Sequence, residues 1–346
     1  MNSQKRTQPI QLLTPAAAGT LQVGAEAVGT FLICFAVYAA SSWGRISTGA
    51  SSIAIACTWV CACIAVGAMF SKISSAHCNP AVTFAAMFTG QIGWLQGVFY
   101  ILGQLIGAAA AGAAVIYLLP MTKENNGQVW LPGAVNGFAE GSPSYATLTQ
   151  YHLSFTITMA IVVELVASLI VVGTAIVSMK KDGQAASGHV WKVALAYGVG
   201  AMITYPITGA GLNPARSTGI ALFARNKGLQ ADPVSQLFVF WICPLLAAAI
   251  VGLITIIYNM IIENAKETLE AEPDTIIEMP EALLTSTGEY ALKEPDKQTD
   301  LLVSVDDNDS DEISASVHPV PVEHTQTSQP SEEPKDTQIS DEESNS

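Results

Sequence analysis

Six long apolar stretches dominate the sequence and limit what it can fold into. They cover residues 22–41, 51–70, 94–118, 154–178, 190–209 and 236–262. Each reaches the length of about 20 residues that a helix needs to cross the hydrocarbon core of a bilayer. We therefore predict an all-α protein with six transmembrane helices embedded in a lipid bilayer.

The composition argues against a water-soluble enzyme. Hydrophobic residues make up 50% of the 346 residues and charged residues only 13%, against roughly 25% charged residues in soluble proteins. A β-barrel is excluded because its strands alternate polar and apolar residues, and these stretches do not. The six cysteines lie in or beside apolar stretches, which favours packing roles. We expect no enzymatic activity, no cofactor or metal, and no nucleic acid partner.

Charge divides the chain into a mildly basic body and an acidic tail. Residues 1–262 hold 11 Lys/Arg and 6 Asp/Glu, whereas residues 263–346 hold 4 and 23. The tail has few aromatic residues, so we expect it to be mostly disordered, either as a solvated appendage or as a regulatory segment whose partners are unknown. The expected domains are an N-terminal segment (1–20), a membrane domain (21–262) and this tail (263–346).

Basic residues in the short connecting segments favour cytoplasmic termini, because Lys and Arg concentrate on the cytoplasmic side of a membrane. With both termini inside, six of these residues lie inside and four outside. The inner set is Lys5, Arg6, Lys72, Lys180, Lys181 and Lys192, and the outer set is Arg45, Lys123, Arg225 and Lys227. We expect a multi-pass protein of the plasma membrane.

Two shorter apolar segments, Asn79 to Phe88 and Asn213 to Phe223, are too short to cross a membrane and too apolar for a water-exposed loop. We predict re-entrant half-helices, which are tolerated at membrane depth when they are buried in protein or line a cavity. Each belongs to one of two similar halves, about 21–120 and 151–262. An odd number of crossings per half inverts the second half, so the two half-helices meet near the midplane.

Each short segment begins with the same tripeptide, Asn79-Pro80-Ala81 in the first half and Asn213-Pro214-Ala215 in the second. Asn accepts hydrogen bonds from free backbone N–H groups as an N-cap, and Pro is suited to the first helical position. Two facing helix N-termini place positive dipole ends at the centre of a pore and direct the two Asn amide N–H groups into it. Such a site favours neutral hydroxylic solutes over protons and cations.

With this pair of motifs, residues 20–262 resemble the aquaporin and glycerol-facilitator (major intrinsic protein) family. The resemblance rests on AEAVGTF (25–31), SSAHCNPAVT (74–83), Gln104, Glu164 and TGAGLNPARSTG (208–219). It implies a right-handed bundle of six tilted helices and two half-helices, with one pore per subunit and usually a homotetramer. The implied function is passive conduction of water and small neutral solutes.

Four further polar residues of the membrane domain are candidates for a role in the pore or its scaffold. A charge inside a membrane segment is costly, and the family's arginine at the position of Arg216 lines the outer constriction; a structural ion pair is the alternative. Glu26 and Glu164 are expected to accept hydrogen bonds from the half-helix loops rather than to contact solute. His77 resembles the family's pore-lining histidine, although it could instead brace its loop.

The family's constriction falls at Trp59, Ala201, Ala210 and Arg216 of this sequence. Water-selective members usually have His at the position of Ala201, so its loss widens the neck and favours glycerol-sized solutes. The residues around the constriction favour a water-selective channel instead, because Ser217, Ala221 and Phe240-Trp241 fit the pattern of water channels. We expect water and glycerol to pass, because the side chains of the constriction meet the solute, and a strictly water-selective channel is the alternative.

Two other classes of protein share features with this sequence. A coupled secondary transporter also has inverted repeats and broken helices, but it needs an ion site, and no membrane carboxylate remains beyond the two assigned to the scaffold. A structural junction protein would not need the polar set of His77, Asn79, Asn213 and Arg216.

Overall fold

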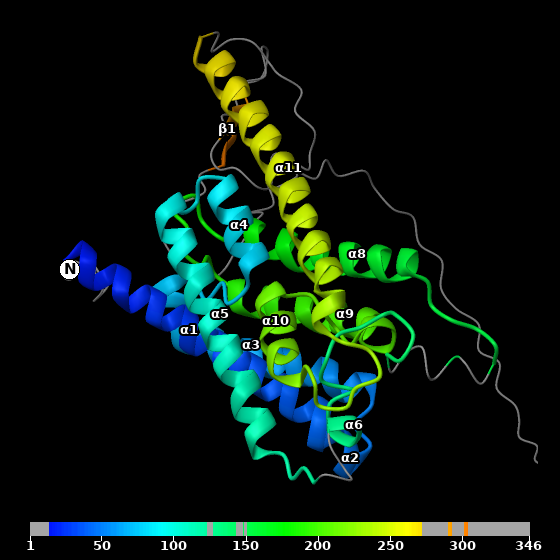
Figure 1. Cartoon of the computed structure of the whole chain (residues 1–346). Coiled ribbons are helices and arrows are strands. Elements are labelled where there is room, and N and C mark those ends of the chain that lie inside the picture. Colours follow the sequence, from blue (N-terminus) through cyan, green and yellow to red (C-terminus); the bar gives the residue numbers. More distant parts are fainter. Residues whose placement is uncertain are drawn as a thin grey trace, which may run out of the picture. The chain divides into compact units, whose positions relative to one another are not determined.

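The computed structural model describes residues 14–122, 127–142, 148, 151–271, 290–292 and 301–303. Six of the described helices are long and apolar enough to cross a membrane, so the chain is a multi-pass, all-helical membrane protein (Figure 1). The long helices are α1 (Pro15–Ala39), α3 (Ser52–Ser74), α5 (Trp94–Leu118), α8 (Ile157–Val177), α9 (His189–Thr208) and α11 (Leu237–Ala271). The short helices α4 (Pro80–Phe88) and α10 (Pro214–Ala224) are the two half-helices.

The remaining described elements are short. After α1 the chain continues through a π-helical turn, η2 (Ala40–Gly44), into α2 (Arg45–Thr48). The other elements are α6 (Gly127–Trp130), the 3-10 turn η3 (Val234–Gln236), and the strands β1 (Tyr290–Leu292) and β2 (Leu301–Val303), which pair with each other. Apart from these two strands, the part of the tail beyond Ala271 lies outside the described residues, and so does the expectation that it is disordered.

The predicted helix boundaries differ from the structure mainly at the two ends of the bundle. Helix α1 begins at Pro15 rather than residue 22, because Thr14 caps it and Pro15 occupies the first helical position. Helix α11 continues to Ala271 rather than residue 262. At about 1.5 Å per residue it is longer than the roughly 30 Å of hydrocarbon, and its end extends beyond the other helices of the bundle (Figure 1).

The helix contacts repeat between the two halves. Helices α1, α3, α4 and α5 correspond in order to α8, α9, α10 and α11, and almost every contact in one half has its counterpart in the other. Thus α1 packs on α3 and α5 as α8 packs on α9 and α11, while α4 packs on α11 as α10 packs on α5. Helices α3 and α9 pack on each other, and α4 touches α10. Each half-helix is therefore surrounded by long helices of both halves.

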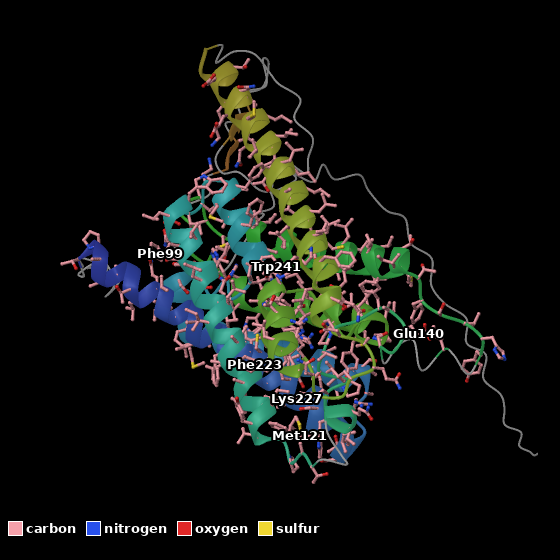
Figure 2. The ribbon with its side chains drawn as sticks, in the orientation of Figure 1. Phe99, Met121, Glu140, Phe223, Lys227 and Trp241 are labelled. Carbon is pink, nitrogen blue, oxygen red and sulfur yellow. The ribbon has the colours of Figure 1, made fainter. Side chains whose placement is uncertain are left out.

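The outer faces of the long helices carry apolar side chains. Leu95, Phe99 and Ile106 on α5 are 72%, 49% and 68% exposed, and Phe99 is labelled in Figure 2. Large apolar side chains exposed over whole helix faces are suited to lipid or to another subunit rather than to water.

Small residues allow α10 to lie directly against α5. A Cβ atom added to Gly219 would stand 2.3 Å from the carbonyl oxygen of Ala108, and one added to Gly112 would stand 2.2 Å from the carbonyl oxygen of Gly219. No side chain fits between these backbones. Van der Waals contact between small residues is the main source of helix association in lipid, where no water is expelled between the helices.

We predict that Gly219→Ala destabilises the bundle. The added methyl group must displace backbone atoms, and overpacking of this kind costs about 1–3 kcal/mol. The measurement is the thermal unfolding midpoint of the purified protein in detergent. Gly173→Ala in α8 is the matched control, because its Cβ would meet only Val251 Cγ2, at 3.8 Å. Equal midpoints for the two variants would show that the contact between α5 and α10 does not limit stability.

Candidate pore

The two half-helices begin with the same hydrogen-bonded cap. Asn79 Oδ1 accepts from Ala81 N at 2.8 Å, and Asn213 Oδ1 accepts from Ala215 N at 3.0 Å and from Arg216 N at 3.3 Å. A proline follows each Asn at the first helical position. Each side-chain oxygen is thereby used inside its own half-helix, which leaves the amide N–H groups for other partners.

The amide N–H groups of the two Asn residues link the halves of the chain. Asn79 Nδ2 donates to the carbonyl oxygen of Leu212 at 3.0 Å, and Asn213 Nδ2 donates to the carbonyl oxygen of Cys78 at 2.7 Å. Leu212 and Cys78 are the residues directly before each Asn, so the bonds are reciprocal. This pair of bonds fixes the two helix N-termini against each other.

The structure differs from the sequence-based expectation at Asn79. Both Asn amides were expected to offer N–H groups to solute, but Asn79 Nδ2 also donates to the hydroxyl oxygen of Tyr197 at 2.8 Å. Its two N–H bonds therefore both have protein acceptors. Asn213 Nδ2 has only the Cys78 carbonyl as an acceptor among the described residues, so one of its N–H bonds remains for solute.

The loops before the half-helices share an unusual backbone. Positive φ angles occur at Ala76 and Cys78 in the first loop and at Ala210 and Leu212 in the second. These residues lie three and one positions before each Asn. Residues other than Gly rarely adopt this left-handed conformation, which costs about 1–3 kcal/mol each and persists only when surrounding contacts enforce it.

Glu26 supplies these contacts for the first loop. One carboxylate oxygen accepts from His77 N at 2.9 Å and from Ser74 Oγ at 2.6 Å, and the other accepts from Cys78 N and Gln104 Nε2, both at 2.7 Å. The Glu26 side chain is fully buried. Four donors therefore replace the water that a carboxylate would otherwise need.

Glu164 does the same for the second loop. It accepts from Gly211 N and Leu212 N, both at 2.9 Å, and from the Thr208 hydroxyl. Thr208 and Ser74 each stand five residues before their Asn, so the two carboxylates hold equivalent atoms of the two halves. These bonds support the scaffold role expected for both glutamates.

Arg216 lies in the first turn of α10 and is fully buried. Its guanidinium donates to the side-chain oxygen of Asn136 and, at 2.9 Å, to the carbonyl oxygen of Ala134, while Nε is buried without a partner among the described residues. The Tyr38 hydroxyl donates to the Arg216 carbonyl oxygen, and the guanidinium carbon lies 5.5 Å from the Tyr38 ring centre. Within the described residues no carboxylate forms an ion pair with Arg216. The guanidinium uses two of its five N–H groups for these acceptors, so the Nε–H is among those left for a solute.

Two cavities lie along the packed pair of α3 and α9. The Arg45 cavity, of about 150 Å³, is lined by Arg45, Ser52 and Tyr205 together with Thr208 and Gly209. The His77 cavity, of about 20 Å³, is lined by Cys63, His77, His189 and Tyr197, among others. A cavity of this smaller size holds about one water molecule.

Two of the four expected constriction residues, Trp59 and Ala201, stand along their helices between residues that line these cavities. On α3, Trp59 stands between Ser52 of the Arg45 cavity and Cys63 of the His77 cavity, and on α9 Ala201 stands between Tyr205 and Tyr197. Trp59, Ala201 and Ala210 are fully buried, as is Arg216, and the Trp59 Nε1 atom has no partner among the described residues. A buried indole N–H without an acceptor indicates a place for water or solute oxygen.

His77 contacts neighbouring side chains and also lines a cavity. Its Nδ1 atom is 3.2 Å from Thr83 Oγ1, and its ring packs edge-to-face on Tyr100 with the centroids 5.6 Å apart. Both contacts brace the loop. The Nε2 atom is buried without a partner among the described residues, and His77 lines the cavity that bears its name.

Sequence analysis missed two residues of this site, Asn136 and Tyr197. Asn136 lies in an irregular connection between α6 and α8, where no periodic pattern marks a functional position. Tyr197 stands four residues before Ala201, so the helical repeat places both on one face of α9. The four-residue spacing from Ala201 was therefore the feature of the sequence that could have identified Tyr197.

Comparisons with known proteins agree with this geometry. A family model described as major intrinsic protein matches residues 16–255. Aquaporin Z of Photorhabdus laumondii subsp. laumondii is 30% identical over 238 residues, which cover 67% of this chain and 94% of that protein. Aquaporin Z of Rhodopseudomonas palustris is 30% identical over 236 residues, which cover 66% and 90%.

A solved structure shows the same fold. The aquaglyceroporin from Plasmodium falciparum superimposes with a TM-score of 0.51 at 20% identity, covering 68% of this chain and 93% of that one. Together, the family match over most of the chain and the paired, capped half-helices show that this chain belongs to the major intrinsic protein family, whose members are channels for water and small solutes rather than enzymes.

Proposed function

We propose that this channel conducts water and small uncharged solutes such as glycerol. The supporting observation is the pair of small side chains, Ala201 and Ala210, at the constriction that also contains Trp59 and Arg216. Neither alanine carries a polar group that a solute carbon would leave unpaired. The Trp59 ring offers an apolar face to the carbon chain, and the free Nε of Arg216 offers a donor to the hydroxyls.

Ions and protons are excluded in the proposed mechanism by the facing N-termini of α4 and α10 and by the Arg216 charge. Positive dipole ends and a guanidinium repel cations, as is general for aquaporin-type pores. The free Asn213 N–H donates to a passing oxygen and turns that molecule away from its neighbours in the file. The pore residues in this proposal are Asn79, Pro80, Ala81, Asn213, Pro214, Ala215 and His77, with the constriction residues.

Strict water selectivity is the second candidate function. The two relatives compared above are both named aquaporin Z, and Ser217 and Phe240-Trp241 fit the water-channel pattern. Phe240 packs against Gly211 in the loop before α10, and Trp241 Nε1 donates to Thr218 Oγ1 of α10 at 2.9 Å, so neither contact is with a constriction residue. Trp241 is labelled in Figure 2. We therefore give more weight to Ala201 and Ala210.

Coupled transport has less support. The carboxylates of Glu26 and Glu164 are occupied by hydrogen bonds from the two loops, so neither is available for a coupling ion. Among the described residues no group of three or more His, Cys, Asp or Glu side chains could hold a metal ion.

The assembly and orientation are also proposals. We propose that the channel lies in the plasma membrane as a homotetramer; the exposed apolar faces of the long helices are suited to lipid or to another subunit. The distribution of Lys and Arg supports cytoplasmic termini, with residues 1–20 and 263–346 as appendages to a channel domain formed by residues 21–262.

We predict that Ala201→His makes the pore more selective for water. The imidazole narrows the neck and adds a polar group that a carbon face cannot satisfy. An unpaired buried polar group costs about 1–3 kcal/mol, so glycerol permeability falls about 5- to 150-fold while water permeability changes little. Stopped-flow light scattering of proteoliposomes in water and glycerol gradients measures both.

Ala201→Val is the control for this change, because it adds bulk without a polar group. A similar loss of glycerol flux in both variants would assign the effect to width alone. Wild-type liposomes that swell in water gradients but take up no more glycerol than empty liposomes would contradict the proposed solute range.

We predict that Asn213→Asp lowers water flux or admits cations. A carboxylate cancels the positive field of the facing half-helices and also leaves the Cys78 carbonyl without its donor, at a cost of about 1–3 kcal/mol. Ion-sensitive dyes inside proteoliposomes report cation entry. Asn226→Asp makes the same chemical change at an exposed position and should behave as wild type. Unchanged flux with intact ion exclusion in Asn213→Asp would argue against a pore at this point.

We predict that truncation after Ala271 leaves a conducting channel. The cut keeps α11 whole, together with the ion pair between Lys181 and Glu263, and removes residues too poor in apolar side chains to pack on the body. Water permeability per mole of truncated protein should match that of the full chain. Complete loss of flux at normal abundance would instead place the tail in the pore or its gate.

A further inference from the structure

Tyr197 contacts two residues of the proposed pore at once. Its ring stacks on Trp59 with the centroids 5.0 Å apart and the planes 3° from parallel, and its hydroxyl oxygen accepts from Asn79 Nδ2 at 2.8 Å. Both rings are almost fully buried. Stacking and the hydrogen bond together hold Tyr197 across the space between α9 and the first half-helix.

This bond changes which donor a solute meets. Asn79 has no N–H left for solute, because its second N–H already pairs with the Leu212 carbonyl. The Tyr197 hydroxyl proton has no acceptor among the described residues. At the level of the paired Asn residues, the donors offered to a solute oxygen are therefore the tyrosine hydroxyl and the free Asn213 N–H, and Asn79 becomes a donor only after Tyr197 has moved.

Tyr197 also lines a cavity from the same face of α9 as Ala201. Positions 197, 201 and 205 share one face of α9; Tyr205 lines the Arg45 cavity and Tyr197 lines the His77 cavity. The Tyr197 ring stacks on Trp59, which lies between Ser52 and Cys63 on α3. A bulky aromatic side chain that lines the His77 cavity thus stands about one helical turn from the small Ala201.

The repeat shows that the tyrosine is not part of the shared scaffold. Tyr197 lies sixteen residues before Asn213, and the residue sixteen before Asn79 is Cys63. The cap bond from the residue two positions after each Asn, the two carboxylate bonds to consecutive loop N–H groups and the positive φ next to each Asn all have counterparts in the other half. A cysteine side chain does not reach across the space that Tyr197 fills, so the scaffold does not need an aromatic residue here.

We propose that Tyr197 is a second selectivity residue, which sets the width and hydrogen bonding of the pore at the level of the paired Asn residues. A solute hydroxyl replaces the Tyr197 oxygen on Asn79, and the ring limits the size of the molecule that follows. This inference rests on the proposed channel function and adds a second filter to the constriction of Trp59, Ala201, Ala210 and Arg216.

The test uses full-length Tyr197→Phe and Tyr197→Ala in proteoliposomes, with water, glycerol and the four-carbon polyol erythritol as solutes. Tyr197→Phe keeps the ring but removes the bond to Asn79. Water permeability should rise about 2- to 12-fold, the equivalent of one neutral hydrogen bond, while erythritol stays excluded. Tyr197→Ala removes the ring as well, so the ratio of glycerol to water permeability should rise and erythritol should enter.

Tyr117→Phe is the control, because Tyr117 on α5 is 80% exposed and lies away from both cavities. Wild-type water permeability in Tyr197→Phe, with a wild-type glycerol-to-water ratio in Tyr197→Ala at normal abundance, overturns the inference. That result leaves the proposed function intact if the wild type conducts glycerol. If the wild type conducts only water and Tyr197→Ala gains glycerol flux, the proposed solute range fails and the role of Tyr197 is supported.

Discussion

The structure depends on two carboxylates that satisfy backbone N–H groups where no lipid group can do so. Irregular backbone at membrane depth leaves donors unpaired unless protein groups accept from them. Glu26 and Glu164 accept from two consecutive N–H groups each, His77 and Cys78 in one loop and Gly211 and Leu212 in the other. Because the two carboxylates bind the N–H groups of Cys78 and Leu212, the carbonyl oxygens of these residues remain available to accept from the Asn of the opposite half. The strained φ angles at these positions follow from the same contacts.

Differences between the halves, rather than the shared scaffold, carry the proposed selectivity. Three residues after the Asn, the first half has Val82 and the second has Arg216; twenty residues before it, the first half has Trp59 and the second has Val193. Equivalent backbone positions thus carry unlike side chains at the pore. The repeated fold provides the same backbone in both halves. In the proposed function, the unlike side chains at equivalent positions determine which solutes pass.

The sequence predicts the long helices and the half-helices because their formation depends on short-range sequence patterns. Apolar length predicts the six long helices, and Asn followed by Pro predicts both half-helices, whose observed starts at Pro80 and Pro214 lie one residue after the caps. Helix α1 begins before its apolar stretch and α11 ends after its own, because helix continuation beyond the membrane depends on capping and polar residues rather than on hydropathy. Contacts between distant segments, such as Asn136 with Arg216, are absent from any local pattern, since they join an irregular connection to a half-helix.

In the proposed pore, Tyr197 compensates for the absence of an imidazole at position 201. The two residues are four apart on α9, so their Cα atoms are separated by about 6 Å along the helix axis. A small side chain at 201 removes bulk near the Arg45 cavity, and the tyrosine restores both bulk and a hydroxyl one turn toward the His77 cavity. In this proposal the polar narrow point is moved along the pore rather than lost. The proposed solute range then depends on two levels in series, and the residues at the first level alone do not determine it.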